Sequence, residues 1–205
     1  MTARRSAATD DGFTLIELLV SVAILGLILL PVSNAFIGVL RNVDATSARM
    51  VASHSAQLSA TYFAQDVAGV GVHDYTASGA PMATSVLTSG DAGSTCGDGG
   101  TGATVRFLSD AYDNTVSPPA LHRAVVSWAV VTVAGDNQMV RSRCVDGSLV
   151  SQLTLAQNVV GSPAVTCSST CDALPLPQTV RLSFSVAPPS AALYAISLTG
   201  DRRQT

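Results

Sequence analysis

The chain has no lysine and only one glutamate, Glu17, among its 205 residues, so arginine and aspartate carry nearly all of its charge. Charged residues make up 12% of the chain and the formal net charge is −3. Without lysine, a phosphate-binding loop of the G-x-x-x-x-G-K-[ST] type is excluded. Without an extended basic patch, binding to nucleic acid is not expected to be a principal function.

The sequence also lacks the side-chain groupings that define catalytic and metal sites. His54, His73 and His122 share no ligand spacing, and no G-x-S-x-G nucleophile motif is present. Residues 97–102 formally satisfy G-x-G-x-x-G, but they follow a glycine-rich stretch rather than a strand, and precede no helix. We therefore expect no enzyme activity, no catalytic residue, no cofactor and no metal. The neighbours His73 and Asp74 are interpreted as a hydrogen-bonded pair at the surface.

A long apolar run follows a short polar leader at the N-terminus. From Phe13 to Leu30 there are 18 residues, which as a helix span roughly 27 Å, close to the thickness of a bilayer core. The apolar character persists to Leu40, and no A-x-A-like cleavage site follows the run, so it is not a secretory signal peptide. Glu17 lies inside it, where a carboxylate costs at least ~2.5 kcal/mol at mid-bilayer. Such a residue is expected to be functional.

The segment Gly12-Phe13-Thr14-Leu15-Ile16-Glu17, with the apolar run after it, resembles the class III signal of type IV prepilins and type II secretion pseudopilins. The resemblance implies that residues 1–12 are a leader, which a prepilin peptidase removes by cutting between Gly12 and Phe13. It further implies N-methylation of Phe13. Removing 12 of 205 residues leaves a mature chain of 193 residues with Glu17 in fifth place.

In such a chain the free amine of Phe13 is charged, and placing it in lipid costs nearly as much free energy as placing the carboxylate of Glu17 there. Pairing the carboxylate of one subunit with the amine of its neighbour cancels both penalties during assembly. The alternative is a tolerated polar residue that reaches the membrane interface. The resemblance implies as partners the prepilin peptidase, other pilins or pseudopilins, assembly platform proteins and the membrane. It implies a single-pass protein of the cytoplasmic membrane with its head outside, later part of an extracellular or periplasmic filament.

The helical pattern continues beyond the apolar run. We expect one helix over residues 13–68, with residues 13–40 as the transmembrane and assembly half and residues 41–68 as an amphipathic half. Pro31 is expected to kink this helix or to start a second section. Gly69 and Gly71 mark its end.

Residues 69–104 are rich in glycine and serine and are expected to form a loop, and residues 105–205 a β-sheet head. The fold class is therefore α+β: a long N-terminal helix packed on one antiparallel sheet of four to six strands, as in pilins. Hairpin turns are expected at residues 135–137 and 146–147. The expected strands are Val105–Leu108, Arg123–Val133, Gln138–Val145, Leu149–Val160, Thr179–Val186 and Leu193–Leu198.

Four cysteines in an exported domain favour disulfide bonds. Cys167 and Cys171 are close enough in sequence to form a local pair, which leaves Cys96 to pair with Cys144. The alternative is a zinc site, but C-x3-C with two isolated cysteines does not match the usual paired knuckles.

Two pairs of arginines could contact an acidic partner or DNA. Arg141 and Arg143 are interpreted instead as a solvated strand face, and Arg202 and Arg203 as a frayed tail. Chain length and cysteine count resemble those of the larger minor subunits, such as the J-type pseudopilin or the W-type minor pilin. Two alternatives stay open: a DNA-uptake or adhesion pilin, and an ordinary signal-anchored membrane protein.

Overall fold

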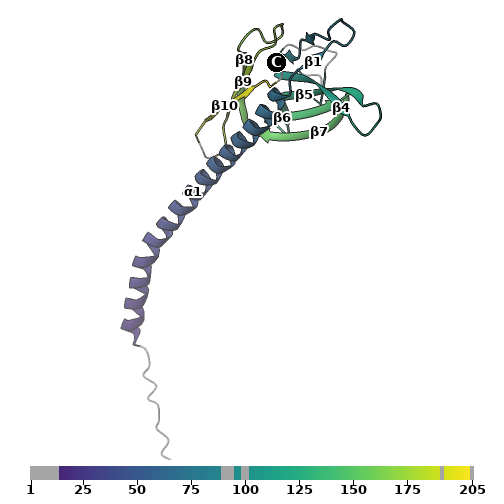
Figure 1. Ribbon diagram of the computed structural model, residues 1–205. Helices are drawn as coiled ribbons and strands as arrows, with labels where there is room; N and C mark the ends of the chain where they lie inside the picture. Colours follow the sequence, from purple (N-terminus) through teal and green to yellow (C-terminus); the bar gives the residue numbers. More distant parts are fainter. Residues whose placement is uncertain (1–13, 89–94, 98–101, 190–191, 204–205) are drawn as a thin grey trace, which may run out of the picture. The chain divides into compact units, whose positions relative to one another are not determined.

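The computed structural model describes residues 14–88, 95–97, 102–189 and 192–203. It has an α+β fold, with one long helix and antiparallel strands, as expected (Figure 1). The chain divides into two compact units at Asp44, and α1 (Leu15–Ala68) contributes to both. The strands are β1 (Val72–His73), β2 (Met82–Ala83), β3 (Val86–Leu87), β4 (Val105–Asp113), β5 (Ala120–Val133), β6 (Asp136–Val145), β7 (Ser148–Ala156), β8 (Val159–Cys167), β9 (Thr179–Val186) and β10 (Tyr194–Asp201).

The first unit consists of the N-terminal section of α1. Its side chains are exposed almost throughout, and the best 18-residue window has a mean hydropathy of 2.7. By length and composition this helix can cross a membrane. The helix continues through Pro31 without interruption, so the expected second section is not seen.

In the second unit, a five-stranded antiparallel sheet has the order β3-β4-β5-β6-β7. Its last two hairpins have two-residue turns in which both residues have positive φ. One is Asp146-Gly147, as expected. The other is Ala134-Gly135, one residue earlier than expected, because β6 already begins at Asp136. Glycine at the second position suits this turn type, since it adopts positive φ without steric cost.

The single expected sheet is in fact divided. β8, β9 and β10 form a separate three-stranded sheet with the order β10-β9-β8, and β1 pairs with β2. The expected strand Leu149–Val160 is wrong, because β7 ends at Ala156 and β8 begins at Val159. Asn158 between them has a φ of 56°, which interrupts the extended backbone. The segment 69–104, expected to be a loop, contains the two-residue strands β1, β2 and β3.

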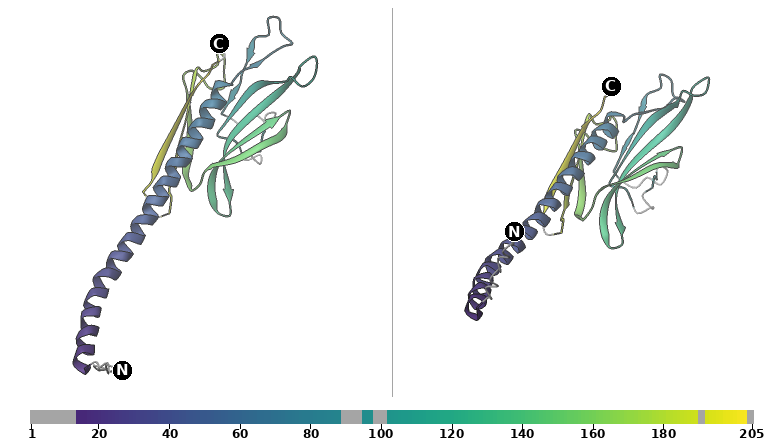
Figure 2. Two further views of the ribbon diagram at one scale, coloured as in Figure 1. Left: turned by 60° about the horizontal axis from the view of Figure 1, so that its bottom comes forward. Right: turned by 90° about the horizontal axis from the view of Figure 1, so that it is seen from below.

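The C-terminal section of α1 lies between the two larger sheets (Figure 2). Phe63 is fully buried and packs edge-to-face on Phe107 and Trp128, at centroid distances of 5.6 and 5.4 Å. On the other side Val67 meets β10 at Gly200, where a Cβ atom would lie only 2.6 Å from the Val67 Cβ. Glycine therefore permits a close approach that no other residue allows.

A buried ion pair joins the helix to the five-stranded sheet. The Arg141 guanidinium donates from Nε to Asp66 Oδ2 (2.7 Å) and from an Nη atom to Asp66 Oδ1 (2.5 Å). Trp128 Nε1 donates to the same Oδ2 at 2.9 Å. The Arg141 guanidinium carbon also lies 5.0 Å from the centroid of the Tyr62 ring. Asp66 and Arg141 are 8% and 7% exposed.

The expectation that Arg141 belongs to a solvated strand face is therefore wrong. Arg143, two residues along β6, is partly exposed. The expectation of a frayed tail is also wrong for the described residues: the amide of Arg202 donates to the Gln178 carbonyl and that of Arg203 to the Ala68 carbonyl at the end of α1. The second bond satisfies a carbonyl that a helix terminus otherwise leaves without a partner.

We predict that Asp66→Ala lowers the free energy of unfolding by about 3–5 kcal/mol, because it leaves the Arg141 guanidinium buried without its counter-charge. The double variant Asp66→Leu/Arg141→Met should be less destabilised than the single variant, since it buries no lone charge. Urea unfolding of the full chain in detergent, followed by the fluorescence of the single tryptophan, measures both. Equal losses in the two variants would contradict this account.

Candidate functional site

Thr14 and Glu17 close the first turn of α1 with reciprocal hydrogen bonds. The Thr14 amide and hydroxyl both donate to Glu17 Oε2, at 3.0 Å each. In return the Glu17 amide donates to Thr14 Oγ1 at 3.3 Å. The Thr14 carbonyl accepts from the amides of Glu17 and Leu18. This arrangement is a capping box, which satisfies amides that a helix start leaves without partners.

The box gives Glu17 a defined position within its own chain. The carboxylate lies at the helix N-terminus, where the helix dipole favours negative charge. Both bonds that it accepts in the described part of the chain end on Oε2, so Oε1 remains available to an external donor. The Glu17 carboxylate is therefore held by its own helix through one oxygen, Oε2.

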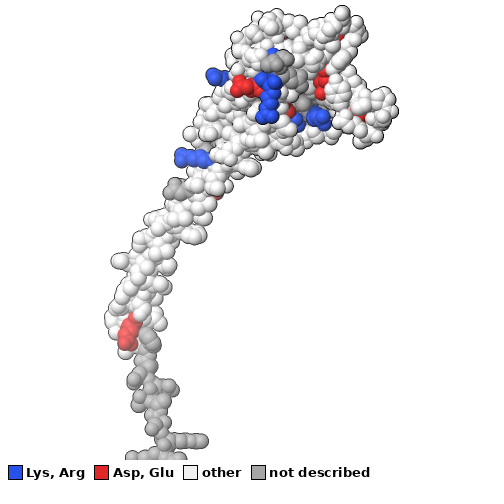
Figure 3. All heavy atoms as spheres, in the orientation of Figure 1, with Lys and Arg blue, Asp and Glu red and all other residues white. Residues whose placement is uncertain are grey.

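The helix around this carboxylate is apolar and uncovered. Leu15 is 80% exposed, and the large apolar side chains from Leu15 to Val43 are about half exposed or more. Figure 3 shows acidic atoms at the start of this section and an uncharged surface after them. An apolar surface of this extent needs lipid or other helices to cover it.

Sequence reasoning identified Glu17 but missed Thr14. The signal was present, because threonine followed three residues later by glutamate before an apolar run is the pattern of a capping box. The predicted cleavage site between Gly12 and Phe13, and the methylation at Phe13, lie outside the described residues.

Residues 9–33 match the family model for the prokaryotic N-terminal methylation motif. The chain has a type IV pilin-like N-terminus. The motif is a substrate signal of prepilin peptidase and indicates a processed, pilin-type protein. Together with the apolar section of α1, it is consistent with a membrane-anchored pilin. No curated protein and no solved structure matches the chain.

The head contains two disulfide bonds, with the pairs favoured by the sequence. Cys96 and Cys144 are joined across 48 residues and are 2% and 1% exposed. They lie in a second apolar cluster formed with Val72, Leu87, Leu108 and Val125. Cys167 and Cys171 are joined across four residues and are partly exposed. By loop length the first bond stabilises by about 4 kcal/mol and the second by about 2 kcal/mol.

A polar hollow of about 530 Å³ lies on the head. His73 Nδ1 lies 2.8 Å from Asp110 Oδ2, so its partner is Asp110 and the expected pairing with Asp74 is wrong. Asp74 instead accepts from Thr76. These bonds hold the turn after β1 against β4. In the described residues, no group of three or more histidine, cysteine or acidic side chains could hold a metal. The lining residues are His73, Asp74, Tyr75, Thr76, Ala83, Asp110, Leu121, His122, Arg123 and Asp146.

Two tyrosines at this hollow form a short chain of hydrogen bonds. The Tyr75 hydroxyl donates to Asp110 at 3.1 Å and lies 2.7 Å from the Tyr112 hydroxyl. The bond with Tyr112 is the largest cause, ahead of desolvation and the bond to Asp110, that raises the pKa of Tyr75. A phenol with a raised pKa is a poor acid near neutral pH, so this chain serves to hold the side chains in place.

A second histidine–aspartate pair closes the hollow. Asp146 lies in the β6–β7 turn, and its Oδ1 accepts a hydrogen bond from the Arg123 amide at 2.9 Å. Its Oδ2 lies 2.5 Å from His122 Nδ1. The bond from the Arg123 amide, followed by that from His122, lowers the pKa of Asp146. The carboxylate thereby fixes the turn to the neighbouring strand.

We predict that the contacts of Asp146 persist at neutral pH and are lost as the pH falls through its lowered pKa. Because the pKa is depressed, the stabilisation is fully present above the ordinary value of about 4, and it is lost as the pH falls from that value through the lowered pKa. An NMR titration of the Arg123 amide measures this transition. In Asp146→Asn the transition should be missing. An unchanged Arg123 titration in that variant would show that another carboxylate is responsible.

Proposed function

We propose that the chain is a structural subunit, a minor pilin or pseudopilin, of a type IV pilus or a type II secretion-like filament. Prepilin peptidase cuts between Gly12 and Phe13, and Phe13 is then methylated. The observation that carries this proposal is the methylation motif at residues 9–33, which leads directly into an exposed apolar helix. Among such subunits, the mature length and the four cysteines favour the J-type or W-type minor members.

The exposed section of α1 supports this role because its apolar side chains need to be covered, first in the membrane and then in the filament. In the cytoplasmic membrane, lipid covers its apolar side chains and the head lies outside the cytoplasm. In a periplasmic or extracellular filament, the same side chains pack against the helices of other subunits. Assembly platform proteins are the partners expected at the transfer between these two environments.

The capping box supports a specific role for Glu17. Before assembly, Thr14 holds the carboxylate at Oε2, so the charge is partly satisfied within its own chain. During assembly, the methylated amine of a neighbouring Phe13 binds Oε1, and the pairing neutralises both charges as the subunit leaves the bilayer. The structural role requires no catalysis, and the subunit is proposed to be no enzyme.

Arg141 does not support the alternative of a DNA-binding head. Arg141 is bonded to Asp66 inside the head and is not available to phosphates. Figure 3 shows the arginines on the visible face of the head as separate groups interspersed with acidic atoms. A dispersed pattern of this kind provides little of the continuous basic track that phosphate backbones select.

Mass spectrometry of the N-terminus, after expression with and without a prepilin peptidase, tests the processing step. We expect loss of residues 1–12 and a methylated Phe13 only when the peptidase is present. Cleavage of a known prepilin in the same cells shows that the peptidase is active. If the leader stays intact under these conditions, the alternative of an ordinary signal-anchored membrane protein is favoured.

Two substitutions at Glu17 separate its charge from its capping role. Glu17→Gln keeps an oxygen that can accept from Thr14 but has no charge, whereas Glu17→Ala loses both. We expect both variants to be processed normally and to enter filaments at least about tenfold less, because the amine of the neighbour is left unpaired. Thr14→Val is the control that removes the threonine hydroxyl and keeps the carboxylate.

Filament incorporation is measured by immunoblotting of sheared filaments against total membrane protein. Normal incorporation of Glu17→Gln together with failure of Glu17→Ala would show that capping, and not charge pairing, matters. Normal incorporation of both variants would contradict any assembly role of Glu17.

A further inference from the structure

The two disulfide bonds of the head differ in their access to solvent. Cys96 and Cys144 are almost completely buried within the second apolar cluster. Cys167 and Cys171 lie at the start of the loop between β8 and β9, where they pack on the edge of the main core and are partly exposed. Thiol–disulfide exchange requires a thiolate to reach a sulfur atom, so access decides which bond reacts. Of the two bonds, the local one is the more exposed.

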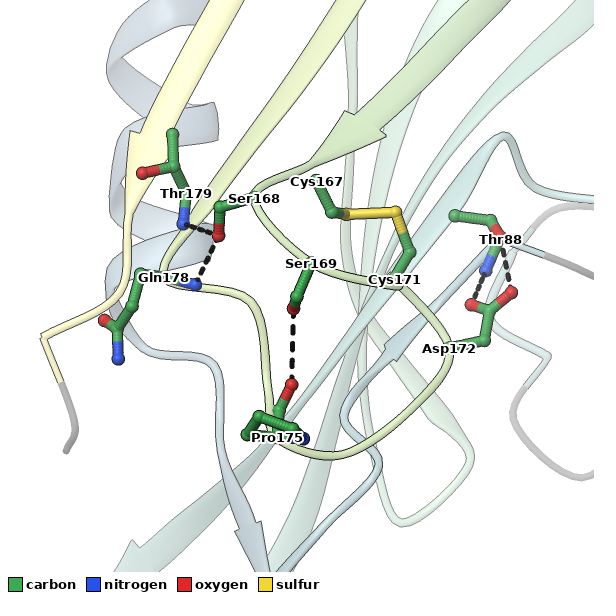
Figure 4. Close-up of a disulfide and its surroundings, with 9 residues drawn as sticks. All are labelled: Thr88, Cys167, Ser168, Ser169, Cys171, Asp172, Pro175, Gln178 and Thr179. Atoms are coloured by element: carbon green, nitrogen blue, oxygen red, sulfur yellow. Dashed lines mark hydrogen bonds between the residues drawn. A yellow bond between two sulfur atoms is a disulfide. The ribbon is translucent and has the colours of Figure 1, made fainter.

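This accessible bond positions a contact between the two larger sheets. Asp172, directly after Cys171, accepts the Thr88 amide at Oδ1 (2.6 Å) and the Thr88 hydroxyl at Oδ2 (2.5 Å). Thr88 follows β3 of the five-stranded sheet, whereas Asp172 follows β8 of the three-stranded sheet. Figure 4 shows this pair of bonds beside the disulfide. We call it the Asp172–Thr88 clasp.

The base of the loop is held by other bonds. The Ser168 amide donates to the Thr179 carbonyl at 2.9 Å. The Ser168 hydroxyl accepts from the amides of Gln178 and Thr179 at 2.9 and 3.1 Å (Figure 4). Leu176 is 6% exposed and anchors the returning side of the loop. Between these anchors, the disulfide, the clasp and one hydrogen bond of 3.3 Å from the Ser169 hydroxyl to the Pro175 carbonyl fix the stretch around Cys171. Opening the disulfide should therefore free this stretch and leave the base intact.

We propose that Cys167–Cys171 is an exchange site for a dithiol reductant, and that its reduction releases the Asp172–Thr88 clasp while Cys96–Cys144 stays oxidised. A thiolate of the dithiol attacks one sulfur of the pair, forms a mixed disulfide and displaces the other sulfur as a thiolate, which takes up a proton. The second thiol of the reductant then attacks the mixed disulfide. The reductant leaves as a disulfide, and both cysteines end as thiols. Two electrons pass to the protein.

Dithiothreitol serves as the probe on the full chain in detergent under native conditions. After limited reduction, free thiols are alkylated and mapped by mass spectrometry. We expect modification of Cys167 and Cys171 at least about tenfold faster than that of Cys96 and Cys144, because a buried disulfide reacts only through opening of the fold. Parallel reduction of the two pairs, or earlier reduction of Cys96–Cys144, would overturn the proposal.

Hydrogen exchange at the Thr88 amide reports on the clasp. We expect limited reduction to raise the exchange rate of Thr88 to the level seen in oxidised Asp172→Ala, with little change at Ser168. Cys167→Ser/Cys171→Ser should show the same rate without reductant and serves as a folded mimic of the reduced loop. Thr88 exchange that is insensitive to reduction, while Asp172→Ala raises it, would show that the disulfide does not control the clasp. These measurements do not depend on leader processing or filament assembly.

Discussion

The buried carboxylate of Asp66 is the constraint on which the head depends. Its oxygens receive the guanidinium of Arg141 and the indole of Trp128, so one group on α1 binds two neighbouring strands, β5 and β6. A rotation or slip of the helix would separate these charges inside the protein, at a cost of several kcal/mol. The ion pair is directional, whereas apolar contacts alone are not. It therefore fixes the rotation of α1, and with it the positions of Phe63 and Val67.

The helix that contains Asp66, α1, has two kinds of surface along its length. Its N-terminal section exposes large apolar side chains and a single capped acid. Its C-terminal section buries Phe63 and Val67 completely. The chain therefore places an exposed apolar surface and the centre of its head core in one continuous element, α1.

Composition and local motifs were sufficient to predict the helix and its apolar section. They also singled out Glu17, whose role in assembly stays a prediction. They did not predict the role of Arg141, because its partner Asp66 lies 75 residues away and an alternating strand offers no sign of an ion pair. The division between the two larger sheets was missed because residues 149–160 contain neither glycine nor proline, and Asn158, which tolerates positive φ, was not read as a break. The capping role of Thr14 was missed, although threonine followed three residues later by Glu17 is a local pattern that the sequence shows.

The contact between Val67 and Gly200 has a consequence for the order in which the head is made. The last turn of α1 is synthesised early, whereas β10, which covers one side of it, emerges late. During synthesis the inner face of the helix must therefore remain without its final cover. The apolar surface around Val67 is then a natural target for chaperones, and the head closes only once β10 has arrived.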